Sequence, residues 1–278
     1  MFYSRLQVIC NPDFSEILMA EIAEVGFDTF METEKGFEAF VEQNQFDKQK
    51  LQDIKDKYTP LTSVVFYIDR VEKKNWNEEW EKSYEPIVVA DTIIIRADFH
   101  KPEKQYPYEI IITPKMSFGT GHHQTTHLML KAQLTIDHKN KTVMDAGTGT
   151  AVLAIMASKL GAKKVEAFDI DSWSVENGNE NTAVNRCANI RIQQGKLSAL
   201  SFSENFDIIL ANINKNILLE EMHQYAAYLK PGGRLLLSGF YETDIPDLLQ
   251  KAQQHDLKKA GSDTRDGWAC LLLEKKSI

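Results

Sequence analysis

The sequence feature that most constrains the fold is an apolar strand that runs directly into a glycine turn and then into a helix. Residues 142–146 (TVMDA) form the predicted strand, residues 147–149 (GTG) the turn, and residues 151–160 the helix, which Gly161 ends. Glycine lets a backbone approach a ligand closely, and a helix that begins at such a turn presents unpaired N–H groups. A GxG turn after a strand is common, so by itself this segment predicts a ligand-binding α/β unit without specifying the ligand.

Strands and helices alternate through most of the remaining chain. Helical patterns of about 10–15 residues separate four further strands, predicted at Val165–Asp169, Ile190–Gln193, Asp207–Ala211 and Arg234–Ser238. This alternation produces βαβ units and a parallel, doubly wound sheet. Near the end, Leu257–Ala260 and Trp268–Glu274 predict two strands that pair antiparallel at the sheet edge. We therefore expect an α/β fold with a Rossmann-like, seven-stranded sheet within residues 86–278, preceded by strand-like segments at Val88–Ala97 and Glu109–Thr113.

The first 72 residues predict a separate, small α+β domain. The order strand, helix, two strands, helix, strand is that of a ferredoxin-like sandwich, with elements predicted at Tyr3–Cys10, Phe14–Val25, Phe27–Glu32, Phe37–Val41, Phe46–Tyr58 and Ser63–Val71. Residues 73–85 are expected to form a linker helix. Trp76 and Trp80 lie four residues apart and therefore share one face of that helix. Their rings either dock on a neighbouring domain or form a wall of a substrate channel.

Composition excludes several classes of function. The net charge of −8 argues against general nucleic-acid binding. Residues 1–72 hold 14 acidic and 7 basic residues, a net charge of −7, which indicates either a solvated acidic surface or a basic protein partner. No apolar run is long enough to span a membrane, and the N-terminus lacks the pattern of a signal peptide. Cys10, Cys187 and Cys270 form no CxxC pair, which favours reduced thiols in a cytoplasmic protein.

The residues around the glycine turn favour one nucleoside cofactor. Asp169 ends the next strand, 22 residues beyond Gly147, where a carboxylate accepts hydrogen bonds from a ribose diol. The dehydrogenase fingerprint requires a glycine at position 152, which is Val152 here. Methyltransferases instead use DxGxGxG, which Asp145 opens in this chain. The turn KPGG at residues 230–233, ahead of the fifth strand, also fits a methyltransferase, so S-adenosylmethionine is favoured over NAD.

Two further segments carry polar groups to the expected site. Asn212 follows a buried strand at its carboxyl end, where doubly wound sheets bind ligands; it is either an ordinary turn residue or the group that orients a substrate nitrogen. The stretch FGTGHHQTTH, residues 118–127, holds His123 and His127 at metal-ligand spacing, but no third ligand clusters with them. The alternative is a cofactor-binding loop shaped by glycines, with Thr125 or Thr126 capping the next helix.

The segments FGTGHHQTTH, DAGTGTAVLAI, FDID, LANI and KPGG, in this order and at these spacings, resemble the ribosomal protein L-eleven methyltransferase (PrmA) family. The likeness is close over residues 114–239 and looser in the linker and the acidic N-terminal domain. It departs from the family pattern at Ala151, which replaces the third glycine, and at Ile213-Asn214-Lys215. The second departure leaves open how Asn214 and Lys215 affect the substrate channel.

The resemblance implies a two-domain, cytoplasmic enzyme that methylates amino groups of a large-subunit ribosomal protein. The N-terminal domain would hold that protein, and the C-terminal domain would bind S-adenosylmethionine and need no metal. A monomer without direct nucleic-acid or membrane contacts is expected. The family's cofactor contacts fall on Thr126, Gly147, Asp169 and Asn212, and Asn212 is also the candidate catalytic residue. Phe118, Gly119, Thr125 and Gly149 are further candidates for the cofactor site, with Phe118 either a wall of the pocket or a core residue.

Three other functions are compatible with parts of the pattern. The chain could methylate another protein, an RNA or a small molecule, although the acidic N-terminal domain disfavours RNA. It could bind S-adenosylmethionine without catalysis, or it could be a dehydrogenase. Lysine amines are protonated at neutral pH, and we expect a desolvated pocket with neutral acceptors, rather than a dedicated general base, to favour the reactive form.

Overall fold

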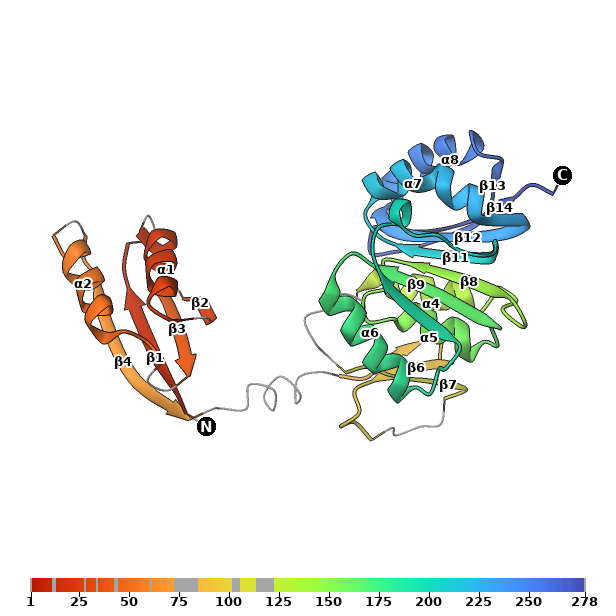
Figure 1. Ribbon diagram of the computed structural model, residues 1–278. Helices are drawn as coiled ribbons and strands as arrows, with labels where there is room; N and C mark the ends of the chain where they lie inside the picture. The colour runs from red at the N-terminus through yellow and green to blue at the C-terminus, as the bar shows by residue number, and fades with distance from the viewer. Residues whose placement is uncertain are drawn as a thin grey trace. The chain divides into compact units, whose positions relative to one another are not determined.

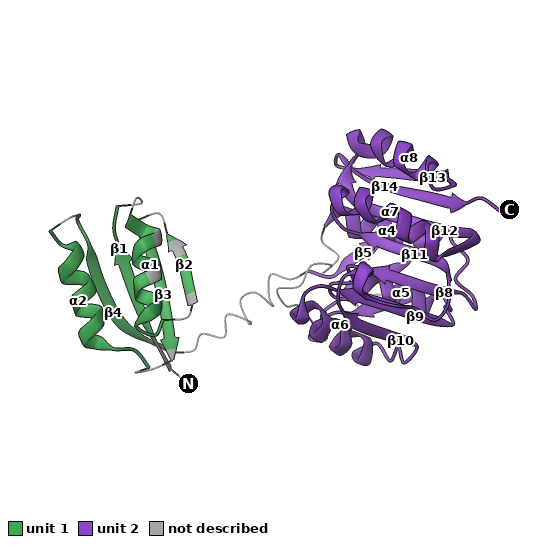
Figure 2. Ribbon diagram, turned by 45° about the horizontal axis from the view of Figure 1, so that its top comes forward, with its two compact units in different colours: residues 1–83 green, residues 84–278 purple. Residues whose placement is uncertain are grey.

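The chain forms two compact units, Met1–Ser83 and Tyr84–Ile278 (Figures 1 and 2). The computed structural model describes residues 2–11, 14–27, 29–33, 35–42, 45–60, 62–72, 85–101, 106–113 and 123–277. Trp76 and Trp80, together with most of the predicted linker helix 73–85, lie outside the described residues.

The N-terminal unit has the predicted ferredoxin-like order of elements: β1 Phe2–Ile9, α1 Ser15–Glu24, β2 Thr29–Thr33, β3 Gly36–Glu42, α2 Lys48–Tyr58 and β4 Val65–Glu72. Its antiparallel sheet has the strand order β2-β3-β1-β4, with both helices on one face (Figure 1). Leu6 and Val8 of β1 alternate toward the helices and pack with Leu18 and Ile22 of α1. The unit therefore has a hydrophobic core of its own.

The main sheet of the C-terminal unit has the strand order β10-β9-β8-β11-β12-β14-β13. Its strands are β8 Thr142–Ala146, β9 Lys164–Asp169, β10 Ile190–Gln194, β11 Phe206–Asn212, β12 Leu229–Tyr241, β13 Leu257–Arg265 and β14 Trp268–Lys275. The first five strands in this order are parallel, and β14 pairs antiparallel with both β12 and β13. The predicted seven-stranded sheet and its antiparallel edge are confirmed.

Helices cover both faces of this sheet: α4 Gln124–Gln133, α5 Val152–Lys159, α6 Ser172–Val184, α7 Lys215–Tyr228 and α8 Ile245–Gln253, with two short 3-10 helices, η2 Leu197–Ala199 and η3 Glu242–Asp244. Alternate strand residues enter two separate cores. Val143 packs with α4 and α5, whereas Met144 packs with α7 and α8. Because both faces are covered, the central strands are mostly apolar, with Asp145 of β8 and Glu166 of β9 as buried exceptions.

A second, three-stranded sheet precedes the main one in the chain. Its strands differ from the sequence prediction at one point. The predicted strand Val88–Ala97 is two strands, β5 Ile87–Val89 and β6 Ile93–Arg96, which pair antiparallel, and β7 Tyr108–Ile111 pairs with β6. Ala90 and Asp91 both have left-handed backbone angles, with φ of 51° and 50°. Two consecutive left-handed residues reverse the chain in a tight hairpin turn, which an alternation pattern does not register.

The KPGG segment lies inside a strand rather than before it. β12 begins at Leu229, which pairs with Phe206, and pairing resumes between Arg234 and Ile208, so residues 230–233 bulge out of the ladder. A Cβ atom at Gly233 would lie 3.0 Å from the carbonyl oxygen of Asp207. Glycine at this position therefore permits the close return of the chain to β11.

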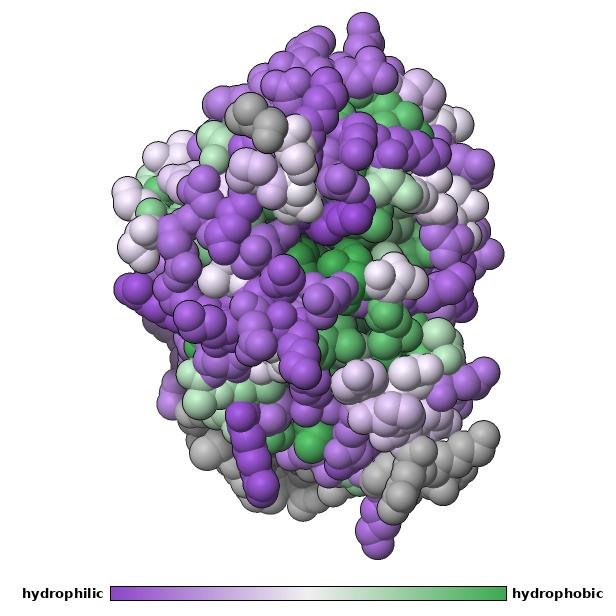
Figure 3. Space-filling model, turned by 90° about the vertical axis from the view of Figure 1, so that its right-hand side faces the viewer, coloured by the Kyte–Doolittle hydropathy of each residue, from purple (hydrophilic) through white to green (hydrophobic). Residues whose placement is uncertain are grey.

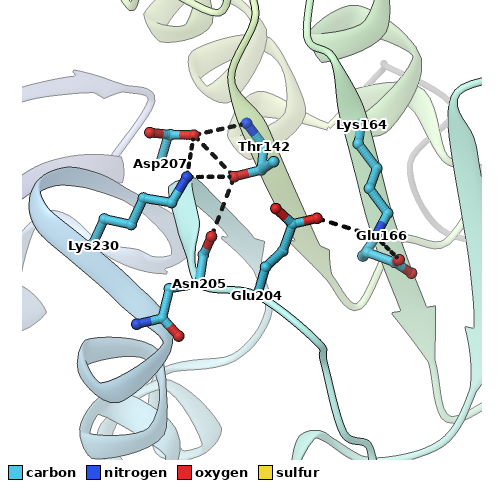
Figure 4. Close-up of polar contacts among 7 residues, drawn as sticks. All are labelled: Thr142, Lys164, Glu166, Glu204, Asn205, Asp207 and Lys230. Carbon is cyan, nitrogen blue, oxygen red and sulfur yellow. Dashed lines mark hydrogen bonds and ion pairs between the residues drawn. The ribbon is translucent and has the colours of Figure 1, made fainter.

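A polar cluster joins the starts of three strands at the end of the sheet opposite to the strands' carboxyl ends (Figure 4). Lys230 Nζ donates to Asp207 Oδ2 at 2.9 Å and to Thr142 Oγ1 at 3.1 Å. The backbone N–H of Thr142 also donates to Asp207 Oδ2, at 2.9 Å. Burial alone would raise the pKa of Asp207, but the bonds from Thr142 and Lys230 outweigh it and lower that pKa. The cluster therefore holds β8, β11 and β12 in register.

Hydrophilic residues cover most of the face shown in Figure 3, and hydrophobic residues reach its surface mainly near the middle. Within the described parts of the chain, no helix is both long enough and apolar enough to cross a membrane.

We predict that Asp207→Asn lowers the free energy of unfolding of the C-terminal unit by about 1–3 kcal/mol at neutral pH, because a charge-assisted acceptor is lost. A carboxyl group whose pKa is lowered by folding stabilises the protein above its unfolded pKa, and this contribution disappears as pH falls through the folded value. The difference between wild type and variant should therefore shrink below about pH 4. Urea titrations followed by tryptophan fluorescence measure both quantities; an equal difference at pH 3 and pH 7 would contradict the assignment.

Candidate functional site

A pocket of about 860 Å³ opens at the carboxyl ends of the parallel strands. Residues directly after β8, β9, β10 and β11 line it, and the starts of α4 and α7 complete its walls. Doubly wound sheets bind ligands at this edge because every parallel strand ends there with a loop. The pocket therefore lies where the sequence places Gly147, Gly149, Asp169 and Asn212, and all four line it.

The glycine turn and Asp169 form one wall. Gly147 and Gly149 have left-handed φ values of 68° and 53°. The N–H of Gly149 donates to Asp169 Oδ2 at 2.9 Å, and the N–H of Asp171 donates to Oδ1 at 3.1 Å. These two bonds fix the orientation of the carboxylate. Since a carboxylate has about four acceptor positions, Asp169 retains acceptors for a diol in the pocket.

Ala151, at the position of the third motif glycine, also adopts the left-handed conformation, with a φ of 64°. It is the N-cap residue of α5. An alanine accepts this conformation at a cost of about 1 kcal/mol. The turn consequently keeps its shape without the third glycine.

Asp145 does not line the pocket but supports the turn from beneath. Its Oδ2 accepts hydrogen bonds from Thr148 Oγ1 at 2.6 Å and from the N–H of Ala154 at 3.2 Å. The residue is completely buried, and Oδ1 has no hydrogen-bond partner among the described residues. Burial raises the pKa of Asp145 to about 7, with the charge of Asp169 acting in the same direction and the two hydrogen bonds opposing it.

Asn212 is held by the residue that follows it. A Cβ atom at Gly147 would lie 2.4 Å from Ile213 Cγ2, and one at Gly239 would lie 2.2 Å from the carbonyl oxygen of Ile213. Only glycines at both positions leave room for Ile213. The Asn212 side chain extends from this fixed backbone, and its Nδ2 makes a long contact of 3.5 Å with Thr126 Oγ1. Its Oδ1 is buried and has no hydrogen-bond partner in the described part of the chain.

Helix α4 begins differently from the sequence prediction. The N-cap is His123, not Thr125 or Thr126, and its Nδ1 lies 3.3 Å from the N–H of Thr125 and 2.8 Å from Thr125 Oγ1. An imidazole nitrogen here accepts the free helix N–H as an Asn or Asp side chain would. Both threonines are fully buried. Thr125 lines the pocket. Thr126 does not line it, but its hydroxyl contacts Asn212, which does.

The remaining members of FGTGHHQTTH divide into two groups. Phe118 and Gly119 lie outside the described residues. His123 packs edge-on against Trp268, with 4.7 Å between ring centroids, and both residues line the pocket. His127 does not line it, and burial lowers its pKa. No group of three or more His, Cys, Asp or Glu side chains is placed to hold a metal within the ranges that the structure describes.

Asparagines on α6 make hydrogen bonds to Thr150, next to the glycine turn, and to Thr113. They were not predicted from the sequence. Asn181 is fully buried and donates to the carbonyl of Thr150 at 2.9 Å, while the N–H of Thr113 donates to its Oδ1 at 2.8 Å. Asn177 donates to the carbonyl of Thr113 at 3.2 Å. Their spacing of four residues places both on one helical face, and that periodicity is a signal that could have identified them.

Sequence reasoning also missed pocket residues on α7 and β14. Ile217, Glu220, Glu221 and Gln224 of α7 line the pocket, as does Trp268 at the start of β14. The helix follows Asn212 directly, so the strand-end rule could have identified its first turns. Asn214 and Lys215 have local roles: Asn214 caps α7, and Lys215 pairs with Asp244 and Asp247 at 2.8 and 2.6 Å. Asn214 lines the pocket, and Lys215 does not.

We predict that Asp145→Asn changes how stability depends on pH. Because folding raises the pKa of Asp145, the native state binds the proton more tightly, and this group destabilises the protein as pH rises from about 4 to 7. The variant lacks this titration, so its stability relative to wild type should increase by roughly 1–4 kcal/mol across that range. Thermal unfolding at pH 5, 6, 7 and 8 measures the effect; parallel curves for the two proteins would rule it out.

Comparison with known proteins gives a consistent result. The family model described as "Ribosomal protein L11 methyltransferase (PrmA)" matches residues 14–276. The ribosomal protein L11 methyltransferase of Phocaeicola vulgatus is 41% identical over 264 residues, which cover 94% of each chain. That of Porphyromonas gingivalis is 41% identical over 259 residues, covering 92% of this chain and 89% of the relative.

A solved structure agrees with the sequence comparisons. The crystal structure of a ribosomal protein L11 methylase from Lactobacillus delbrueckii subsp. bulgaricus is 31% identical and superposes with a TM-score of 0.64. The match covers 69% of this chain and all of that one. With the glycine turn, Asp169 and Asn212 meeting in one pocket, and with relatives matching along nearly the whole length, the chain belongs to the ribosomal protein L11 methyltransferase (PrmA) family.

Proposed function

We propose that this protein transfers methyl groups from S-adenosylmethionine to amino groups of a large-subunit ribosomal protein, the L11 protein after which its relatives are named. The observation that carries the proposal is the buried Oδ1 of Asn212, which has no partner among the described residues, in a pocket that the glycine turn and Asp169 also line. A buried acceptor without a donor costs free energy unless a ligand supplies one. An amine N–H is such a donor.

The residues of the pocket fit S-adenosylmethionine. Asp169 retains acceptor positions for the two ribose hydroxyls, and the turn at Gly147 and Gly149 has no side chains that would keep a ligand from the backbone. Thr125 and His123 lie at the start of α4, whose free N–H groups suit a carboxylate. When bound, the cofactor supplies both the methyl group and the neutral thioether leaving group.

The protein's part in the reaction is to position an amine and favour its neutral form. Methyl transfer is an in-line displacement in which the amine lone pair forms the new bond to carbon and the amine later loses a proton to solvent. Asn212 Oδ1 would accept one N–H of the amine and so aim its lone pair. Deprotonating a lysine at pH 7 costs about 4–5 kcal/mol, and partial desolvation beside Ala146, Ile213 and Trp268 lowers that cost.

The N-terminal unit is proposed to recognise the ribosomal protein. It has its own core, so its surface is available for a task separate from catalysis. Its net charge of −7 within residues 1–72 complements a basic protein. We therefore assign substrate recognition to residues 1–72, and cofactor binding and methyl transfer to residues 86–278.

We predict different effects for substitutions at two pocket residues, Asp169 and Asn212. Asp169→Ala should raise the Kd for S-adenosylmethionine at least about ten-fold, because bonds to a charged acceptor are lost. Asp169→Asn, which retains one acceptor oxygen, should show a smaller effect. Asn212→Ala should lower kcat by about 10- to 100-fold with a smaller change in cofactor affinity, because it misplaces the amine. Calorimetry and single-turnover assays separate the two; unchanged cofactor binding by Asp169→Ala would overturn its assignment.

We also predict that a chain without residues 1–72 binds S-adenosylmethionine normally but methylates the ribosomal protein at a rate reduced by at least about ten-fold, because the recognition surface is gone. Mass spectrometry of large-subunit ribosomal proteins, incubated with either chain and the cofactor, counts the methyl groups added and identifies the protein that receives them. If the full-length chain modifies no ribosomal protein, the proposed substrate is wrong. If the shortened chain is fully active, the recognition role is wrong.

A further inference from the structure

One face of α7 forms a wall of the pocket. Ile217, Glu220, Glu221 and Gln224 follow the spacing i, i+3, i+4, i+7, which places them on a single side of the helix, and all four line the pocket. The opposite side of α7, with Leu218, Met222, Tyr225 and Ala226, is buried against the sheet. The helix therefore presents one apolar, two acidic and one amide side chain to whatever enters.

This wall and the groups that fit the cofactor belong to different segments of the chain. The groups that fit the cofactor, Gly147, Gly149 and Asp169, belong to the loops after β8 and β9. The α7 face instead follows Asn212, the residue that would hold the amine, in the chain. A pocket of about 860 Å³ is near the upper end of the range for small-molecule sites, about 300–1,000 Å³. It accommodates a nucleoside cofactor together with a side chain presented by a protein.

The two glutamates on this face differ in their partners. Glu221 accepts a hydrogen bond from the hydroxyl of Tyr225, one turn further along α7, which restrains its carboxylate. Glu220 is exposed and makes no ion pair or side-chain hydrogen bond with the described residues. The lining as described has four carboxylates (Asp169, Asp171, Glu220 and Glu221) and one amine, Lys196. The pocket is thus electrostatically suited to a cation, and Glu220 has an unused charge.

Apolar side chains border the same opening. Ile170 and Trp173 are 63% and 70% exposed, and Ile217 is 37% exposed. Ile170 and Ile217 line the pocket, and Trp173 lies between Asp171 and Ser174, which also line it. Single exposed apolar residues are ordinary, but several around one opening indicate a surface that another protein covers. Apolar and acidic groups together suit a polypeptide segment that carries both aliphatic and basic side chains.

We propose that the Ile217/Glu220/Glu221/Gln224 face of α7 docks the segment of the ribosomal protein that carries the methylated amine, and that Glu220 pairs with a lysine or arginine near that amine. This inference rests on the proposed function, which it extends from the reacting atoms to the selection of the substrate segment. Glu220 acts in substrate recognition and not in the methyl transfer step.

The test compares Glu220→Lys and Glu220→Gln with a matched control, Glu176→Lys. Glu176 is exposed on α6, does not line the pocket, and its substitution changes the net charge by the same amount. Steady-state methylation of the purified ribosomal protein is measured at saturating S-adenosylmethionine and at two ionic strengths. Calorimetry with S-adenosylmethionine alone confirms that each variant is folded and retains its cofactor site.

For Glu220→Lys we expect the KM for the ribosomal protein to rise about ten-fold, with a much smaller change in kcat, because like charges now face each other. Glu220→Gln should raise KM less and should weaken the dependence of KM on salt. Glu176→Lys should match wild type. An unchanged KM in Glu220→Lys, or an equal increase in Glu176→Lys, overturns the inference. If wild type transfers no methyl group to the ribosomal protein, the proposed function fails, and this inference fails with it.

Discussion

The site depends on the close approach of three chain segments, at Gly147 after β8, at Ile213 after β11, and at Gly239 near the end of β12. Ile213 occupies the space that a Cβ atom at residue 147 or 239 would need, so glycine is required at both. This packing acts together with the pairing of β11 to β8 on one side and to β12 on the other. Together they fix the backbone at Asn212. The pocket's catalytic candidate is therefore positioned by main-chain contacts and not by a network of flexible side chains. The wall formed by the glycine turn and Asp169 and the wall formed by α7 both extend from this point.

Two features of the turn impose a cost on stability. Asp145 is buried with one oxygen that has no partner among the residues described, and Ala151 adopts a left-handed conformation without being glycine. Buried carboxyl groups and strained backbone persist where the surrounding structure requires them. Here Asp145 joins Thr148 of the turn to Ala154 of α5, and Asn181 holds Thr150 from the other side. The turn is thus held in a shape that leaves its outer face open to a ligand.

The sequence predictions were correct where a structure follows from a local pattern of residues. β8 was predicted with its observed bounds, and the antiparallel strands of the tail were predicted because a glycine-bearing turn separates two strand-like segments. Two expectations were wrong because a local exception overrode the pattern. Ala90 and Asp91 adopt left-handed angles and divide an apparently continuous strand, and His123 takes the capping position expected of Thr125 or Thr126. Alanine rarely adopts left-handed angles, and histidine is not among the usual N-cap residues.

The sequence by itself determined the α/β class, the two-unit organisation, the family, and the positions of Gly147, Asp169 and Asn212 at strand ends, because these follow from hydrophobic periodicity and from short motifs. The tertiary structure decided which side chains share the pocket. Trp268 and the α7 face join it through strand order and helix orientation, and Thr126 is separated from it by Asn212. Within the described part of the chain, the same packing leaves the Oδ1 of Asn212 without a partner and Glu220 exposed. Such relations join residues far apart in the chain, and only the closed packing of sheet and helices creates them.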